Sequence, residues 1–197
     1  AMGYQAGQTD QLGEAVAIGD QAGTLDQGAF SVAVGNSSGQ TTQGGDAVAV
    51  GNAAGTTTQG AGSVAVGSSA GNNTQGANGI AVGNAAGLTT QGTSAVSVGE
   101  QAGLTNQSTQ AVAIGRQAGR IEQGAQGVGV GYFAARYNQG QNAVAIGREA
   151  GAGSVTVGDF QGANAVAVGS NSGQTSQNAN AVAVGNAAGQ TDQGTAS

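Results

Sequence analysis

A sixteen-residue unit repeats along almost the whole chain, and this period constrains the fold more than any other feature. The pentapeptide AVAIG at residues 15–19 recurs as SVAVG at 31–35 and AVAVG at 47–51, and the pattern continues toward the C-terminal end. One step, between Ala143 and Ala165, is 22 residues long instead of 16. A short fixed period of this kind is typical of solenoids, in which each repeat forms one coil of a stack. We therefore expect an all-β parallel β-solenoid of about twelve sixteen-residue coils.

The pattern inside one repeat predicts two short strands and two turns. We number the positions one to sixteen from the residue that opens the pentapeptide. Positions two and four are Val or Ile in every complete copy and position three is small, which predicts a strand whose branched side chains form the core. Glycine at positions five and nine predicts turns with positive φ. Position eleven is mostly Thr, with Leu25 and Ile121 in two copies, so we expect it to face inward on a second strand.

Glutamine occupies position thirteen in every copy. Strand propensity does not require glutamine there, whereas a stacked column of amides lets each side chain donate a hydrogen bond to one neighbouring coil and accept one from the other. An ordinary exposed polar position is the alternative interpretation. The predicted structural ladder comprises Gln11, Gln27, Gln43, Gln59, Gln75, Gln91, Gln107, Gln123, Gln139, Gln161, Gln177 and Gln193.

The core expected from this pattern is thin, because each coil supplies only two branched apolar side chains. The side chains at position three are small enough to let another chain approach that face closely, so we expect a parallel homo-oligomer with cyclic symmetry. The pentapeptide, followed by xxAG and then QG, resembles the YadA-like head repeats of trimeric autotransporter adhesins and of related trimeric phage and bacterial surface fibres. The resemblance implies a left-handed β-roll, an intertwined or side-by-side homotrimer, and an extracellular place on a cell surface or a virion fibre.

Composition excludes several classes of function. The net charge is −6 and all four cations are Arg, so we expect no nucleic-acid partner, which would require basic groups to neutralise phosphates. The chain has neither His nor Cys, and therefore lacks the commonest metal ligands and nucleophile–base pairs. We expect no enzyme activity, no metal and no cofactor. No apolar run approaches the roughly 18 residues of a membrane span, so we expect no membrane insertion by this segment.

Two places depart from the repeat, and in a repeat protein such exceptions are candidates for function. We expect one repeat domain over residues 1–197, a fragment of a longer fibre, with irregular coils at 127–142 and 152–160. The second of these carries the six extra residues and is expected to form a shortened coil or an outward loop. The first places Arg and aromatic residues in columns at positions six and ten. The candidate ligand-binding ridge comprises Arg116, Arg120, Tyr132, Phe133, Arg136, Tyr137 and Arg148.

Rings stack on sugar faces and guanidinium groups bind carboxylate or phosphate, so this ridge predicts a site for a cell-surface glycan or another host surface molecule. The alternative is a solvated turn in which Glu122 and Glu149 neutralise the nearby Arg. The function expected first is a trimeric adhesin segment that acts as a rigid spacer. An ice-binding solenoid is the second hypothesis, although its Thr columns are interrupted, for example by Leu25 and Tyr137. A passive spacer without any ligand is the third.

Overall fold

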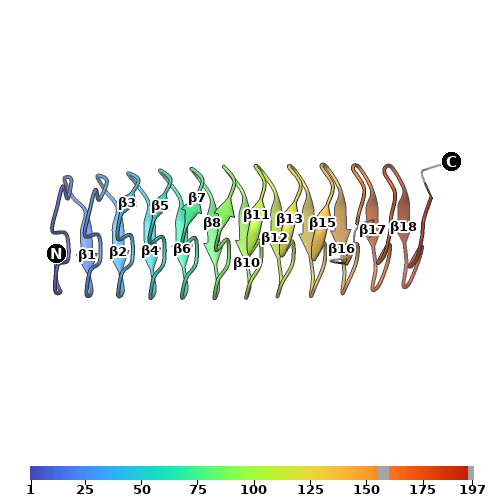
Figure 1. Ribbon diagram of the computed structural model, residues 1–197, viewed down its shortest axis with the longest axis horizontal. Coiled ribbons are helices and arrows are strands. Elements are labelled where there is room, and N and C mark those ends of the chain that lie inside the picture. The colour runs from blue at the N-terminus through green and yellow to red at the C-terminus, as the bar shows by residue number, and fades with distance from the viewer. Residues whose placement is uncertain (155–159, 195–197) are drawn as a thin grey trace.

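The computed structural model describes residues 1–154 and 160–194, which form an elongated rod of stacked coils (Figure 1). Every regular element in these residues is a β-strand or a turn, and none is a helix. The described part of the chain accordingly holds no helix able to cross a membrane. The fold is a parallel β-solenoid with a sixteen-residue repeat, as the sequence predicts.

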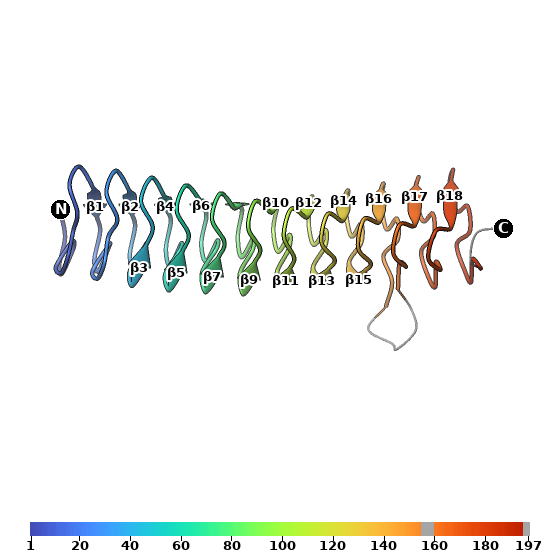
Figure 2. The same ribbon diagram turned by 90° about the horizontal axis from the view of Figure 1, so that it is seen from above.

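Within the described residues, two parallel sheets run along the rod and are visible as two rows of strands in Figure 2. The Val/Ile sheet has 11 strands, namely β1 (Val16–Ile18), β2 (Val32–Val34), β4 (Val48–Val50), β6 (Val64–Val66), β8 (Ile80–Val82), β10 (Val96–Val98), β12 (Val112–Ile114), β14 (Val128–Val130), β16 (Val144–Ile146), β17 (Val166–Val168) and β18 (Val182–Val184). The Gln sheet has 7 strands, namely β3 (Thr42–Gln43), β5 (Thr58–Gln59), β7 (Thr74–Gln75), β9 (Thr90–Gln91), β11 (Thr105–Gln107), β13 (Ile121–Gln123) and β15 (Tyr137–Gln139).

Equal positions of successive coils lie opposite one another. Val16 pairs with Val32 at the start of the Val/Ile sheet, and the pairing keeps the same register along the rod. The longer step does not interrupt it, because Val144 of β16 pairs directly with Val166 of β17. β16 and β17 are therefore direct neighbours in this sheet. Residues 155–159, on which the expectation of a short coil or a loop falls, lie outside the described residues.

The two faces of the Val/Ile sheet are reversed relative to the expectation from the sequence. Alanine at position three is fully buried, as at Ala49, whereas Ile18 is 43% and Ile114 is 40% exposed. The prediction that Val and Ile form the core is wrong. The reason is the narrow interior: a Cβ atom placed on Gly39 would lie only 3.3 Å from the Cβ atom of Ala33. The coil therefore accepts only a small side chain at position three, and the branched side chains face outward. Because the small face lies inside the coil, the expectation that another chain approaches it is wrong as well.

Alanine and glutamine together fill the interior. Position eight supplies a second column of small buried side chains, so that Ala54 and Ala70 join Ala49 and neighbouring alanines in one apolar cluster. From the opposite side the glutamines of position thirteen point inward, and Gln107 is 1% exposed. Position eleven lies outside, since Leu25 is 41% exposed, and the expectation that it faces inward is also wrong.

Glycine at position five is required by both conformation and space. Gly67 has a φ of +127°, a value that side chains rarely allow. A Cβ atom there would lie 2.6 Å from the carbonyl oxygen of Gly83 in the next coil. The turn predicted from this column is confirmed, and close stacking of the coils depends on it.

Candidate ligand-binding site

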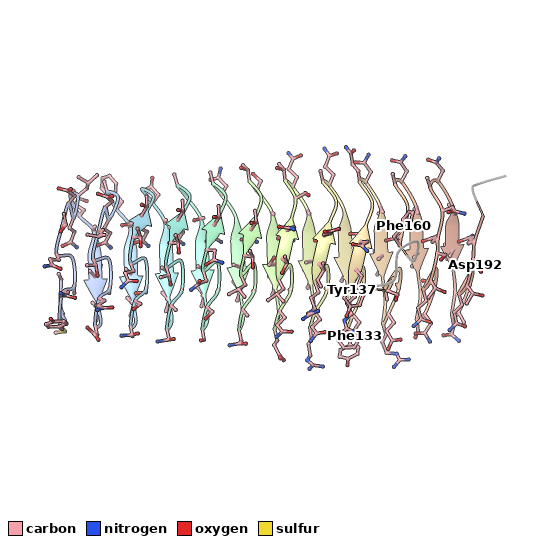
Figure 3. The ribbon with its side chains drawn as sticks, in the orientation of Figure 1. Phe133, Tyr137, Phe160 and Asp192 are labelled. Carbon is pink, nitrogen blue, oxygen red and sulfur yellow. The ribbon has the colours of Figure 1, made fainter. Side chains whose placement is uncertain are left out.

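The coil at 127–142 brings three aromatic rings and one guanidinium group together. The ring centroids of Tyr132 and Phe133 lie 3.9 Å apart, with an angle of 27° between the ring planes. The guanidinium carbon of Arg136 lies 4.1 Å from the centroid of Phe133 and 4.8 Å from that of Tyr137. Both distances are within the range of cation–π attraction. Figure 3 shows Phe133 at one edge of the rod and Tyr137 farther in on the same part of the chain.

The path of the chain explains how these residues meet. β14 ends at Val130, the turn carries Tyr132 and Phe133, and the chain returns to begin β15 at Tyr137. Phe133 has a φ of +58°, which would signal local strain if it occurred alone. Gln117 and Glu149, at the same position of the adjacent coils, have φ values of +55° and +56°. The conformation therefore belongs to the coil, and the aromatic side chain is the added feature.

Arg116 extends the cluster toward the N-terminal end. Its Nη1 donates a hydrogen bond of 3.3 Å to the hydroxyl oxygen of Tyr132, and its Nε donates one of 3.2 Å to Oε2 of Glu100. Both side chains of the ion pair are about half exposed, at 48% and 50%, so solvent weakens their attraction. Arg116 and Tyr132 thus meet one above the other in the column that the sequence predicts for position six.

The remaining cations of the predicted ridge lie beside this cluster. Nη1 of Arg148 lies 3.5 Å from Oε1 of Glu149. Glu149 is one of the two carboxylates expected to neutralise nearby Arg residues if this region is only a solvated turn. Arg120, one coil before Arg136 in the same column, has a buried Nε atom without a hydrogen-bond partner among the described residues, and the Nε atom of Arg136 shares this state.

A cavity of about 270 Å³ opens next to the cluster. Its lining comprises Phe133, Arg136, Tyr137, Glu149, Ala152, Gly153 and Gln174. Ala152 and Gly153 belong to the coil between those that carry Arg136 and Gln174 at position ten, and neither has a long side chain to fill this space. Oε2 of Glu149 accepts a hydrogen bond of 2.7 Å from Nε2 of Gln174, which fixes the carboxylate at the wall.

Sequence reasoning identified the cations and rings but missed Glu149, Gln174 and the two small residues as parts of a site. The available signal was the small pair Ala152 and Gly153 at positions where the preceding coil carries Arg136 and Tyr137. In the described part of the chain, no cluster of three or more acidic side chains is placed to hold a metal ion.

The glutamine column lies in the interior and forms two kinds of hydrogen bond. Each amide donates to the backbone, as Nε2 of Gln107 does to the carbonyl oxygen of Val96 at 2.8 Å. From Gln91 onward the amides also bond to one another, and Gln107 donates to Oε1 of Gln123 at 3.1 Å. Before that point the Oε1 atoms, such as that of Gln43, have no hydrogen-bond partner among the described residues.

Fold and repeat define the class of this chain as a parallel β-solenoid repeat protein. No family model, no curated protein and no solved structure matches it. The function therefore has to be argued from the surfaces of the rod itself.

Proposed function

We propose that the chain is a non-enzymatic segment of a trimeric surface fibre. Three copies lie side by side with their Val/Ile sheets facing one another, and the coil at 127–142 is displayed outward as a binding surface. In this role the rod is a rigid extracellular spacer on a cell surface or a virion, and its partners are two further copies of itself and a cell-surface glycan. It is also an adhesin segment, because attachment occurs through the displayed coil.

The outward apolar face of the Val/Ile sheet carries this proposal. Branched side chains at positions two and four point away from the interior in each coil, and Ile114 and Ile146 within the rod are 40% and 41% exposed. A contiguous apolar face of this kind on a soluble protein is typical of an interaction surface. The face is also regular, since 11 strands keep one register.

A second copy of the chain is the partner that fits this face. Its coils have the same spacing, so branched side chains of the two copies meet level by level along the rod. Identical surfaces that meet around a symmetry axis give closed oligomers. The apolar face supports association of the chains, whereas the expected number of three chains comes from the resemblance to YadA-like head repeats.

Light scattering on a sizing column tests the proposal. We expect a mass of about 55 kDa, three times the 18.4 kDa of one chain. Val66→Lys in β6 places a charge on the Val/Ile face and should yield the single chain. Thr58→Lys in β5 places the same charge on the exposed face of the Gln sheet and serves as the matched control, which should keep the trimer. A folded 18.4 kDa species of the unmodified chain would contradict the proposal.

The ice-binding hypothesis has one supporting observation. Thr42, Thr58, Thr74 and Thr90 are exposed and pair in register across four coils. Asn106 ends this row, which is short for a surface that must match an ice plane. If the unmodified chain proved monomeric, inhibition of ice recrystallisation would be the next assay. A trimer that fails to attach to any cell or glycan would leave the passive spacer.

A further inference from the structure

We infer that the cavity beside Arg136 binds an acidic pyranose, a six-membered sugar ring that carries one anionic group. The inference rests on the proposed function, because it names the ligand class that the displayed coil would recognise. It concerns one cavity in one chain, however, and its test requires no trimer.

The size of the cavity limits the ligand to one ring. Its volume of about 270 Å³ lies just below the range of about 300–1,000 Å³ that is usual for small-molecule sites. Phe133, Tyr137 and Ala152 form an apolar wall, against which the C–H groups of a sugar ring can pack. Glu149 and Gln174 supply polar atoms to the same lining, and a carboxylate or an amide can bind sugar hydroxyl groups.

Arg136 is the group that selects an anion. Its guanidinium is held by the two rings at 4.1 and 4.8 Å, so little side-chain freedom is lost when a ligand binds. Its Nε–H is buried without a hydrogen-bond partner among the described residues. The Nε atom of Arg120 is in the same state, so what distinguishes Arg136 is that it lines the cavity, where its planar guanidinium can match an anionic group with two oxygen atoms.

The surrounding charge favours an anion at this place and not elsewhere on the rod. The chain has a net charge of −6, yet all four of its cations and only two of its ten carboxylates lie in residues 111–150. Of these two, Glu149 is paired with Arg148 at 3.5 Å and accepts a hydrogen bond from Gln174. Arg116 is paired with Glu100 of the preceding coil, so Arg120 and Arg136 are the cations without a carboxylate partner among the described residues. The cavity therefore lies in the one cationic region of an acidic rod, and this region attracts anionic ligands.

The residues of this site occupy other positions of the coil than the proposed interface. Phe133 occupies position seven of its coil, and Arg136 and Tyr137 occupy positions ten and eleven, whereas the Val/Ile face is formed by positions two and four. A ligand can consequently reach the cavity in a single chain and in an oligomer alike.

Titration calorimetry with the full chain tests the inference, with sodium glucuronate, glucose 6-sulfate, glucose and sodium acetate as probes at one ionic strength. We expect glucuronate or glucose 6-sulfate to bind one site per chain with a dissociation constant in the millimolar range, and glucose and acetate to bind at least tenfold more weakly. The first two probes distinguish a carboxylated from a sulfated sugar, and either result supports an acidic pyranose.

The repeat provides substitutions that the coil already tolerates. Arg136→Gln introduces the residue type that already occupies position ten in another coil, as at Gln40, and should weaken binding of the acidic sugar at least tenfold. Arg120→Gln removes the same charge from the same column one coil earlier and should change binding less than twofold. Phe133→Ala, the residue of Ala53 at position seven, should also weaken binding, while the circular dichroism spectra of all variants stay unchanged.

Equal binding of glucuronate and acetate, equal effects of Arg136→Gln and Arg120→Gln, or no binding of either acidic sugar would overturn the inference. None of these results bears on the mass of the particle. A trimer without sugar binding refutes this site alone, and a sugar-binding monomer refutes the trimeric fibre alone.

Discussion

Gln107 lies at the centre of the best-connected part of the interior. Its Nε2 donates to the carbonyl oxygen of Val96 at 2.8 Å, and its Oε1 accepts from the hydroxyl of Ser97 at 2.7 Å and from Nε2 of Gln91 at 3.1 Å. Gln43 donates to two backbone carbonyls, but its Oε1 has no partner among the described residues. The same residue type thus occurs in the same column with and without a side-chain network.

Substitution by Met keeps the length of the side chain and removes the amide. Loss of the backbone hydrogen bonds lowers the free energy of unfolding by about 1–2 kcal/mol at either position, because each such bond contributes about 0.5–1.5 kcal/mol net. Gln107→Met also leaves the hydroxyl of Ser97, which is 0% exposed, without its acceptor, and this adds about 1–3 kcal/mol. We expect losses of about 2–5 kcal/mol for Gln107→Met and about 1–2 kcal/mol for Gln43→Met.

Urea unfolding followed by circular dichroism measures both losses, at one protein concentration because association stabilises the folded chain. Ser97→Ala added to Gln107→Met removes the unsatisfied hydroxyl and should restore about 1–3 kcal/mol, so the double-mutant cycle isolates the coupling. Losses that agree within about 0.5 kcal/mol for the two glutamines, or a further loss on adding Ser97→Ala, would refute the reasoning.

Two further predictions concern the small residues. Gly67→Ala should lower the free energy of unfolding in urea by more than about 3 kcal/mol, since φ of Gly67 is +127° and the new Cβ atom would clash with the backbone of the next coil. Gly45→Ala is the control. Its Cβ atom would lie 3.4 Å from the nearest atom, so the free energy of unfolding should stay within about 1 kcal/mol of the original chain. Gly129→Ala alone should cost about 1–3 kcal/mol, because the new Cβ atom lies 3.1 Å from that of Ala135, and adding Ala135→Gly should recover the loss by restoring the arrangement of the other coils; a double variant no more stable than the single one would contradict this pairing.

The architecture follows from the sequence because the period and the glycines determine it directly. Position five has φ values near +130° throughout, as at Gly35 with +129°, and side chains other than hydrogen are excluded there. The direction of the strand faces does not follow in the same way. Alternation distinguishes two faces, but which one is inside depends on the width of the coil, and that width is set by the approach of Gly39 to Ala33 and Gln43 across the interior.

The candidate site also has one part that the sequence predicts and one part that it does not. Contacts between equal or neighbouring positions, such as Arg116 with Tyr132, follow from stacking at sixteen-residue steps. The cavity depends instead on what is missing from the coil between Arg136 and Gln174, where Ala152 and Gly153 leave space. The hydrogen bond from Gln174 to Glu149 then fixes one part of its wall. The repeat pattern of the sequence predicts neither the empty space nor this hydrogen bond.

The branched residues of the Val/Ile sheet require an explanation from outside the single chain. They do not fill its interior, and strand propensity alone would be met equally well by Thr, which is also β-branched. Thr is abundant in this chain, yet it occurs at neither position two nor position four of any complete repeat. The interface between copies that we propose would account for this preference for apolar residues outside the interior.

The prediction is that Val50→Thr, Val66→Thr and Val82→Thr together separate folding from association. Because these side chains face outward, the stability of the single chain should change by no more than about 0.5 kcal/mol per site. In an oligomer each substitution removes a buried methyl group and buries a hydroxyl, at about 1 kcal/mol or more, so the concentration for half dissociation should rise at least a hundredfold. A dilution series in light scattering measures this rise. If the triple variant associates like the original chain, the branched residues serve only to form strands, and the interface between copies lies on another face.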